Sequence, residues 1–440
     1  MPRQWAQVAA LMAAAALSMA CTDAPSSPAA APLITPSASR SGARPTEPSH
    51  YTITDLGTLG GSFSIAYDIN DAGRVSGAAT VPGELQHAVY WADGKITDVG
   101  TLGGPNSEAA GRSERAELAI LSDTRERDPL EENFCGLGTG LVCGAAVWSH
   151  GTLTALPTLG GINAAAFMDN TAGMIVGVAE DGTRDATCIP PQKSHFQAVA
   201  WYRGTIHELP PLPSDEVGIA LRLNDRGQAV GTSGLCSNTT YGGFALGPHA
   251  VLWDHGTPIN VGDLGGGGVA VAADVNNRGE VVGSASVSAG GLHPFLWTRA
   301  TGIRDLGVMS SDPADVANTP FEINDRGQMV GASCDATLAV CRGYLWEHGV
   351  MTDINDLLPA DSPLYVMLPF ALNDRGQIAG LALVTSTGEV HAFLATPAPD
   401  ASAGQIAHAS RRAKGRVHLP EHVREMLGRR FQKRFQTHGR

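Results

Sequence analysis

Short runs of apolar residues separated by glycine-rich turns repeat along residues 51–396 of this chain. One run ends in Asn, a tight turn and Gly, as at Phe321–Gly327, and a second follows it and ends in Gly, as at Met329–Gly331. The third run is aromatic, as at Gly343–Trp346, and the fourth ends near Asp-Leu-Gly. Short strands joined by turns rich in Asn, Asp and Gly are typical of antiparallel sheets, so the pattern predicts an all-β fold.

The four runs recur as a unit, and Trp marks the third run of six units. Consecutive Trp residues lie between 44 positions (Trp253 to Trp297) and 57 positions (Trp91 to Trp148) apart. A seventh aromatic run ends at Ala395. Four strands in each unit of this length are the signature of propeller blades, so seven units predict a seven-bladed β-propeller with four-stranded blades. A β-solenoid and two separate sandwiches are the alternatives.

The ends of the repeat region predict how the propeller closes. The last aromatic run, His391–Ala395, has no Asp-Leu-Gly strand after it, whereas the region opens with an orphan one, Tyr51–Gly57. The N-terminal strand is therefore expected to close the last blade. The Ala-rich first run of each unit would lie innermost, where side chains must be small. The connections from second to third strand would share one face with the Gly-Thr-Leu-Gly-Gly loops.

Residues 1–21 are typical of a bacterial signal peptide. The apolar run Val8–Ala20 is too short to span a bilayer. Leu17-Ser18-Met19-Ala20-Cys21 resembles a lipobox, which predicts lipidation of Cys21 and a membrane-anchored lipoprotein. Ordinary cleavage near Ala20, giving a secreted protein, and an uncleaved cytoplasmic helix are the alternatives. Residues 22–50 are rich in Pro, Ser and Ala and read as a disordered tether.

Charge is distributed unevenly between the repeat region, residues 51–397, and the tail, residues 398–440. The net charge is −13, but residues 411–440 carry ten Lys and Arg against two acids, so the remainder is about −21. An acidic body argues against nucleic-acid binding. In the tail, Leu419 to Phe435 could form a basic amphipathic helix that contacts anionic lipid, lipopolysaccharide or the acidic propeller. A disordered tail is the alternative.

Two recurring phrases resemble those of the HAF-repeat family, extracellular repeats named for His-Ala-Phe. The match is literal at His391-Ala392-Phe393 and close at His87-Ala88-Val89. The companion phrase Asp-Leu-Gly-Thr-Leu-Gly-Gly stands whole at Asp55–Gly61. The resemblance covers roughly residues 51–396 and implies an extracytoplasmic location. It brings no established reaction and no catalytic residues.

Six cysteines follow Cys21, and all lie in the expected connections from second to third strand. In an exported protein they predict disulfides, with two local pairs and a third bridge between the third and fourth units. The spacing of a zinc site, C-x₂₋₄-C, is absent, and no metal or cofactor is expected. The expected pairs are Cys135 with Cys143, Cys334 with Cys341, and Cys188 with Cys236.

Other candidate chemistry is weaker. His87, His249, His293 and His391 occupy equivalent positions, which favours packing roles over a shared metal. The Asn-Asp-x-Gly turns lack the alternating oxygens of a calcium loop. No nucleophile elbow, zinc-protease motif or phosphate loop is present. Five acids in one long connection could be catalytic, but are better read as a solvated loop; they are Asp123, Glu126, Asp128, Glu131 and Glu132.

The sequence thus predicts an exported, lipid-anchored repeat scaffold that acts as a monomer and binds a glycan or an envelope protein at one propeller face. Catalysis is not expected. The alternatives are a polysaccharide hydrolase or lyase that uses acids on the loop face, and a structural component of an envelope complex. A binder should gather aromatic residues on its loops, where Tyr241 and Phe244 are the candidate pair. An enzyme should instead bring two acids and a His or Tyr together in the channel.

Overall fold

A computed structural model describes residues 51–111, 117–241, 245–309, 315–398 and 417–435. The chain divides into Met1–Glu47 and Pro48–Arg440, and every described residue belongs to the second unit. The predicted signal peptide, the tether, Cys21 and Phe244 lie outside the described residues. Among the described helices, none is both long and apolar enough to span a bilayer.

The described part of the chain is almost entirely β-structure, as the alternation of apolar runs and turns predicts. Many of its strands are followed by a turn that contains a Gly or another residue with a positive φ angle. In the first half the strands are β1 (Tyr51–Asp55), β2 (Ser64–Ile69), β3 (Val75–Thr80), β4 (Gln86–Ala92), β5 (Lys95–Gly100), β6 (Ser107–Ala110), β7 (Glu117–Arg127), β8 (Leu141–Ser149), β9 (Thr152–Ala155), β10 (Ala164–Asp169), β11 (Met174–Arg184), β12 (Ser194–Tyr202) and β13 (Thr205–Leu209). In the second half they are β14 (Val217–Leu223), β15 (Gln228–Gly234), β16 (His249–Asp254), β17 (Thr257–Gly262), β18 (Gly265–Val275), β19 (Val281–Val287), β20 (Leu292–Thr298), β21 (Gly302–Asp305), β22 (Ala317–Ile323), β23 (Met329–Cys334), β24 (Cys341–Glu347), β25 (Val350–Asp353), β26 (Leu364–Leu372), β27 (Ile378–Val384) and β28 (Val390–Pro397). A short 3₁₀ helix, η1 (Ile354–Leu357), follows β25, and one α-helix, α2 (Glu421–Phe435), ends the described chain.

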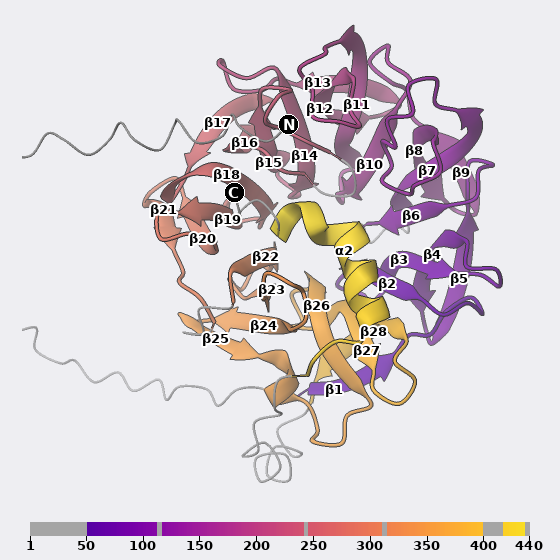
Figure 1. The fold of residues 1–440 in the computed structure, drawn as a ribbon, viewed down its shortest axis with the longest axis vertical. Helices are drawn as coiled ribbons and strands as arrows, with labels where there is room; N and C mark the ends of the chain where they lie inside the picture. Colours follow the sequence, from indigo (N-terminus) through magenta and orange to yellow (C-terminus); the bar gives the residue numbers. More distant parts are fainter. Residues whose placement is uncertain (1–50, 112–116, 242–244, 310–314, 399–416, 436–440) are drawn as a thin grey trace, which may run out of the picture. The chain divides into compact units, whose positions relative to one another are not determined.

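The strands form antiparallel meanders arranged in a ring, which is the β-propeller fold (Figure 1). Five meanders are separate four-stranded sheets: β2 to β5, β6 to β9, β10 to β13, β14 to β17, and β26 to β28 with β1. The predicted closure is confirmed, because β1 pairs with β28 from Tyr51↔Pro397 to Asp55↔Phe393. The first strand of the propeller thus completes the sheet built by the last three.

The number of separate blades differs from the prediction of seven. Five blades are four-stranded sheets, and strands β18 to β25 form one eight-stranded sheet instead of two further blades. The junction is a parallel pair, Leu292↔Ala317, between β20 and β22. It exists because β21 covers β20 only from Phe295 to Thr298, so the amide of Leu292 is left to bond the carbonyl of Val316 at 3.0 Å.

Aromatic residues of the third strands pack between neighbouring sheets. Trp201 and Trp253 are buried, and their indole nitrogens donate to the carbonyls of Pro157 and Pro210 at 2.8 and 2.7 Å. Each acceptor follows the outer strand of the preceding sheet, so each Trp joins two sheets by apolar packing and a hydrogen bond. The second unit lacks the Asn-turn-Gly segment between its first two runs, yet it also forms a sheet, with β7 as its second strand.

The Asn of each tight turn links neighbouring sheets. Asn324 accepts hydrogen bonds from the amides of Arg326 and Gln328, which fixes its own turn. Its side-chain amide donates to the carbonyl of Asn373 at 3.0 Å, one repeat further on. Asn373 in turn donates to the carbonyl of Asn70 at 2.9 Å, across the seam of the ring. The same contact joins Asn170 to Asn224, Asn224 to Asn276, and Asn276 to Asn324.

The basic tail includes a helix that packs on the propeller. Leu419, Val423 and Leu427 are buried against residues that include Leu338 and Tyr365. The amide of Leu419 donates to the carbonyl of Ala339 at 2.9 Å, and Nε2 of His422 lies 2.9 Å from the carbonyl oxygen of Gly388. Figure 1 shows α2 across the middle of the ring. Of the two predictions for the tail, the helix that contacts the propeller is the one found.

Candidate binding chamber

A chamber of about 770 Å³ lies among the innermost strands and extends to α2, from which Met426 contributes to its wall. β-Bulges interrupt the innermost strands, for example between Ala66 and Asp68 and between Ala166 and Met168. A bulge leaves one residue without a partner in the ladder and re-aims its side chain. Six such residues line the chamber: Tyr67, Phe167, Leu221, Ala273, Phe321 and Phe370.

These bulge residues correct one expectation from the sequence. The innermost runs are rich in Ala, but they place four aromatic rings at the axis. The rings of Phe321 and Phe370 are 4.7 Å apart, and those of Tyr67 and Phe370 are 5.9 Å apart, in tilted arrangements that aromatic pairs prefer. A sequence signal existed, because each bulge residue stands three positions before the Asn of its turn, as Phe321 does before Asn324.

Among the described residues that line the chamber, Arg222 is the only basic one. Its guanidinium lies 2.8 Å from the carboxylate of Asp68 and 3.3 Å from that of Glu322, and it donates to the carbonyl of Tyr67 at 3.1 Å. Asp68 and Glu322 are buried, so they need this cation to offset their loss of hydration. The cluster joins three sheets.

Amide and carboxyl groups from the first two sheets form a polar side of the chamber. Asn106 accepts a hydrogen bond from the amide of Gln86 at 3.0 Å, and the Gln86 side chain donates to Glu108. Glu84 accepts from the hydroxyl of Ser62 at 2.9 Å, and this bond is the main reason why the pKa of Glu84 is below its ordinary value. The chamber therefore combines aromatic walls with fixed hydrogen-bonding groups.

Tyr241, the described member of the predicted pair Tyr241 and Phe244, is part of the chamber wall. The Tyr241 side chain is buried, with its ring 5.0 Å from that of Phe134 and 5.4 Å from that of Phe167. Burial, with a smaller contribution from the charge of Glu108, raises the pKa of the Tyr241 phenol. Tyr241 thus faces an enclosed aromatic cluster rather than open solvent.

Three of the five acids expected in a solvated loop are buried: Asp123, Asp128 and Glu132. None of the three is among the residues that line the chamber. Glu132 accepts from the amides of Lys193 and Ser194, in the connection between β11 and β12. Asp123 accepts from the side chains of Asn106 and Thr139, and Asp128 accepts from the amides of Leu130 and Glu132 in its own connection. The spacing of charges along the sequence did not reveal these contacts. Glu126 and Glu131 are exposed, as expected.

Glu180 lies beside Glu132 and shares its buried environment. One carboxyl oxygen of Glu180 accepts from the backbone and side-chain amides of Asn163 at 3.0 and 3.2 Å. Burial is the largest cause, and the Glu132 carboxyl the next, of a pKa of Glu180 raised to about 8. At neutral pH the Glu180 carboxyl is therefore expected to keep its proton, and Glu180 is not among the residues that line the chamber.

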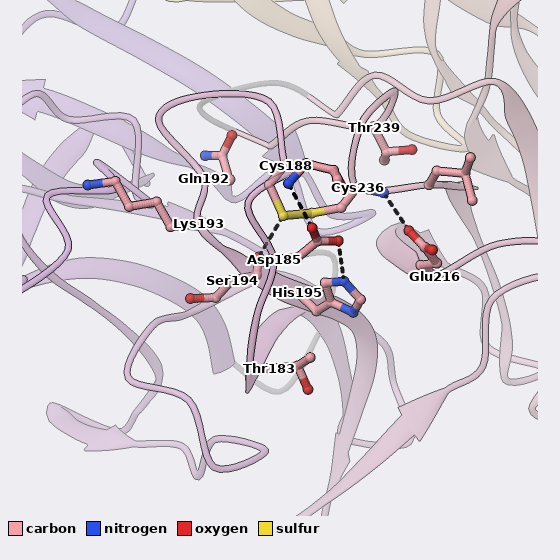
Figure 2. The surroundings of a disulfide bond; sticks show 12 residues. Thr183, Asp185, Cys188, Gln192, Lys193, Ser194, His195, Glu216, Cys236 and Thr239 are labelled. Carbon is pink, nitrogen blue, oxygen red and sulfur yellow. Dashed lines mark hydrogen bonds and ion pairs between the residues drawn. A yellow bond between two sulfur atoms is a disulfide. The ribbon is translucent and has the colours of Figure 1, made fainter.

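The structure contains the three disulfides with the expected pairing. Cys135–Cys143 and Cys334–Cys341 each close a local connection, with Cα atoms 5.2 and 4.2 Å apart. Cys188–Cys236 links the connection after β11 to the connection after β15, and its Cα atoms are 4.3 Å apart. Asp185 and His195 lie beside this third bridge (Figure 2). Three disulfides are typical of a protein that folds in an oxidising compartment.

The equivalent histidines make equivalent contacts outside the chamber. Nδ1 of His391 lies 2.9 Å from a carboxylate oxygen of Asp55, and the same atom of His87 lies 2.9 Å from Asp98. His293 pairs with Asp305 in the same way. The His of the His-Ala-Phe phrase thus contacts the Asp of the Asp-Leu-Gly phrase on the adjoining strand. His249 pairs instead with Asp215, because its own outer strand carries Asn260 at that position.

No family model matches the chain, and no curated protein matches its sequence. Among solved structures, the β-propeller domain of the Trilobed protease from Pyrococcus furiosus is similar, with a TM-score of 0.43 and 10% identity, over 76% of this chain and 93% of that one. Acylaminoacyl peptidase from Pyrococcus horikoshii matches with a TM-score of 0.41 and 13% identity, over 70% of this chain and 48% of that one. An Aleuria aurantia lectin in complex with Fucalpha1-6GlcNAc matches with a TM-score of 0.35 and 9% identity, over 78% of this chain and 99% of that one.

The match to the peptidase thus spans about half of that enzyme's length, and a match to TolB from Acinetobacter baumannii spans 60% of that chain. Every one of these TM-scores is below 0.5. The likenesses therefore carry no argument about the ligand or the activity of this protein.

Proposed function

We propose that this protein is an exported, noncatalytic binding scaffold of the HAF-repeat type, and that its ligand is a glycan held in the central chamber. The observation that carries the proposal is the chamber itself, about 770 Å³ in volume and lined by aromatic rings and amide and carboxyl groups. Concave sites with mostly apolar walls and a few fixed polar groups are the usual form of ligand-binding pockets.

The composition of the lining favours a glycan over a purely apolar ligand. A sugar ring has an apolar C–H face that packs on aromatic rings such as Tyr67, Phe321 and Phe370. Its hydroxyls require donors and acceptors at fixed positions, which Gln86 and Asn106 supply because other side chains hold them in place. A protruding segment of an envelope protein is the second candidate ligand, because the same groups accept an aromatic or amide side chain.

The proposed location rests on three features together. The disulfides suit an oxidising compartment, residues 1–21 are typical of a signal peptide, and Cys21 stands at the end of a lipobox-like sequence. Lipidation of Cys21 would anchor the protein, and residues 22–50 would serve as its tether. Labelling cells with a radioactive fatty acid tests this directly: the wild type should be labelled and C21A should not. Equal labelling of the two proteins would exclude Cys21 as the anchor.

A polysaccharide hydrolase or lyase is the second candidate function, because the chamber lining contains two acids, Glu84 and Glu108, and two tyrosines, Tyr67 and Tyr241. Their environments do not suit this role. A general acid needs a raised pKa, whereas the hydrogen bond from Ser62 lowers that of Glu84. A tyrosine base needs a lowered pKa, whereas burial raises that of Tyr241. Binding without turnover is therefore the better proposal.

A glycan array probed with the purified full chain tests the proposal. We expect selective retention of one group of oligosaccharides, with a loss of at least about tenfold in affinity for Y67A, because this ring is part of the chamber wall. The matched control is Y202A. Tyr202 ends β12 and is absent from the chamber lining. Its removal should leave binding unchanged.

Turnover distinguishes the two functions. The same preparation is incubated with a panel of polysaccharides, and new reducing ends and unsaturated sugars are measured. An absence of glycan binding, together with cleavage that E84Q abolishes, would replace the binding proposal with the enzymatic one. Binding lost equally in Y67A and Y202A would instead place the ligand outside the chamber.

A further inference from the structure

Four side chains with the chemistry of zinc ligands meet at the bridge between the sheets β10–β13 and β14–β17. Nε2 of His195 lies 3.0 Å from a carboxylate oxygen of Asp185. The ligand atoms of Asp185, His195 and Cys236 all lie within 4.8 Å of one another. Cys188 is not one of these three residues, but its sulfur is bonded to that of Cys236 and so lies next to the group. Figure 2 shows the carboxylate and the imidazole beside the sulfur atoms.

The cluster has close to the size that a tetrahedral zinc site requires. Zinc bonds of about 2.0–2.3 Å place neighbouring ligand atoms roughly 3.3–3.8 Å apart. The ligand atoms of Asp185, His195 and Cys236 are at most 4.8 Å apart, so each separation has to change by no more than about 1.5 Å to reach this scale. Asp185 and His195 are about one-fifth exposed (21% and 17% of their side chains), so a metal ion can reach them from solvent, while the two cysteines are buried.

The disulfide keeps this site closed, because sulfur atoms bonded to each other are not thiolates and do not bind zinc. We propose that reduction of the Cys188–Cys236 bridge converts the cluster into a zinc site, with Cys188, Cys236, His195 and Asp185 as its four ligands. Sequence spacing did not indicate it, because the two cysteines are 48 positions apart and come from different sheets.

A dithiol can serve as the reductant of the Cys188–Cys236 bridge. Two electrons and two protons pass from the dithiol to the bridge, which gives two protein thiols and an oxidised cyclic disulfide. Zinc then displaces the proton of each thiol, so two protons are released on binding. His195 binds through Nε2 as the neutral imidazole, with its proton on Nδ1, and Asp185 changes from hydrogen-bond partner to ligand.

Zinc would keep the two sheets joined after reduction has broken the disulfide between them. Cys188 lies in the connection between β11 and β12, and Cys236 in that between β15 and β16, so the bridge joins two sheets. The metal would join the same two connections through four bonds. Among the residues that the structure describes, this is the only group of three or more His, Cys, Asp or Glu ligand atoms close enough for one ion. Reduction of either of the other two disulfides would therefore not produce a comparable zinc site.

Cobalt is the probe that tests the proposal, because thiolate ligation to Co²⁺ gives intense charge-transfer absorption and tetrahedral geometry gives characteristic visible bands. The full chain is reduced with a dithiol, desalted without oxygen and titrated with Co²⁺ and then Zn²⁺. We expect one equivalent of Co²⁺ in the reduced protein and none with thiolate bands in the oxidised protein. Zinc should then displace the cobalt and abolish the bands.

Variants separate this site from the other thiols. H195A is purified in its oxidised form and then reduced; it should bind Co²⁺ at least about tenfold more weakly, whereas H255A, at an exposed histidine, should match the wild type. C135S/C143S should keep the bands, and C188S/C236S should lose them. Bands that survive in C188S/C236S, equal binding by H195A and the wild type, or no bands in the reduced wild type would each overturn the proposal.

Discussion

The Asn of each tight turn shows how one side chain serves both a turn and the whole ring. Its carbonyl oxygen accepts from two amides of its own turn, and its amide nitrogen donates to the next sheet. Asp at this position would still accept from the amides of its own turn, but it could not donate to the next sheet. The turn function was predictable from the sequence, because Asn tolerates the conformation required there. The contact with the next sheet was not, because it depends on the distance between two sheets.

This division of roles predicts the effect of N324D. The new carboxylate faces the carbonyl of Asn373 and the side-chain oxygen of Gln328, to which the amide of Asn324 now donates. We expect a loss of about 1–3 kcal/mol in the free energy of unfolding, measured by urea denaturation at pH 7. N260D is the control, because Asn260 is exposed and its oxygen accepts from Gly262. Equal stability of N324D and N260D would contradict the assigned role.

The buried pair Glu132 and Glu180 predicts a specific dependence of stability on pH. The pKa of Glu180 is about 8 in the folded protein against 4.5 as its ordinary value, so the fold binds its proton more tightly than the unfolded chain does. The stability contributed by this proton is complete below about pH 4.5 and is lost as the pH rises through about 8. The protein should therefore lose stability progressively between about pH 4.5 and about pH 8, with no further loss from this group at higher pH.

E180Q carries the equivalent of the protonated side chain at every pH. It should gain on the order of 2 kcal/mol over the wild type at pH 9 and differ little from it at pH 5. Urea midpoints at the two pH values measure the difference. E126Q, at an exposed acid, should follow the wild type at both. A wild type and E180Q with parallel pH profiles would show that Glu180 does not hold this proton.

At the scale of single residues, the positions of the chamber side chains and of the nearby buried acids were the hardest to predict from the sequence. Phe167 and Phe321 lie in runs that alternate as ordinary strands, and a strand pattern does not show that a bulge turns one residue toward the axis. Asp128 and Glu132 lie in a polar segment, and charge alone does not show that Asp128 accepts from the Asn163 side chain or that Glu132 accepts from the Ser194 amide. Both cases depend on contacts between segments far apart in the chain.

At the scale of elements, α2 is the part of the molecule that the repeats do not explain. Its apolar stripe of Leu419, Val423 and Leu427 was visible in the sequence. The surface that the stripe covers was not, because the loop residues beneath it, such as Leu338, come from a connection that does not recur in the other units. The helix therefore adds a separate layer to a propeller that is closed without it.

L427D tests whether α2 is attached independently of the propeller. Leu427 is buried, so a carboxylate there should release the helix, while the sheets keep their hydrogen bonds. We expect hydrogen exchange in residues 417–428 to rise at least about tenfold, with a change of a few degrees at most in the melting temperature of the sheets. E425A, on the exposed face of α2, is the control. Unchanged exchange in L427D would show that the stripe does not hold the helix.

At the scale of the whole molecule, the repeat pattern predicted the all-β propeller and its closure by the first strand. The boundary between blades was less predictable. Each unit supplies four strands, but a single parallel pair at Leu292 and Ala317 merges two meanders into one sheet. Such a pair depends on where β21 ends relative to β20, by a few residues, and no repeat pattern fixes that length.

The seam of the ring is expected to be a major determinant of stability. Tyr51, the first residue of β1, is buried among residues that include Val330, Ile354 and Phe393. Y51A should cost about 3–5 kcal/mol of unfolding free energy, the usual range for a large aromatic residue in a core. Y202A, at the partly exposed end of β12, should cost less than about 1.5 kcal/mol. Similar losses in urea denaturation would show that the seam is no more important than any other edge.

The pairing of β1 with β28 also sets an order of events during synthesis. Thr52 bonds to Thr396, 344 positions later. At about 5–20 residues per second, a ribosome needs roughly 17–70 s to cover that distance. Throughout this interval β1 is already made and its partner is not, so its backbone edge is open to other chains. A truncated product that ends before β28 keeps that edge permanently, and an unpaired strand edge is a template for pairing with another chain.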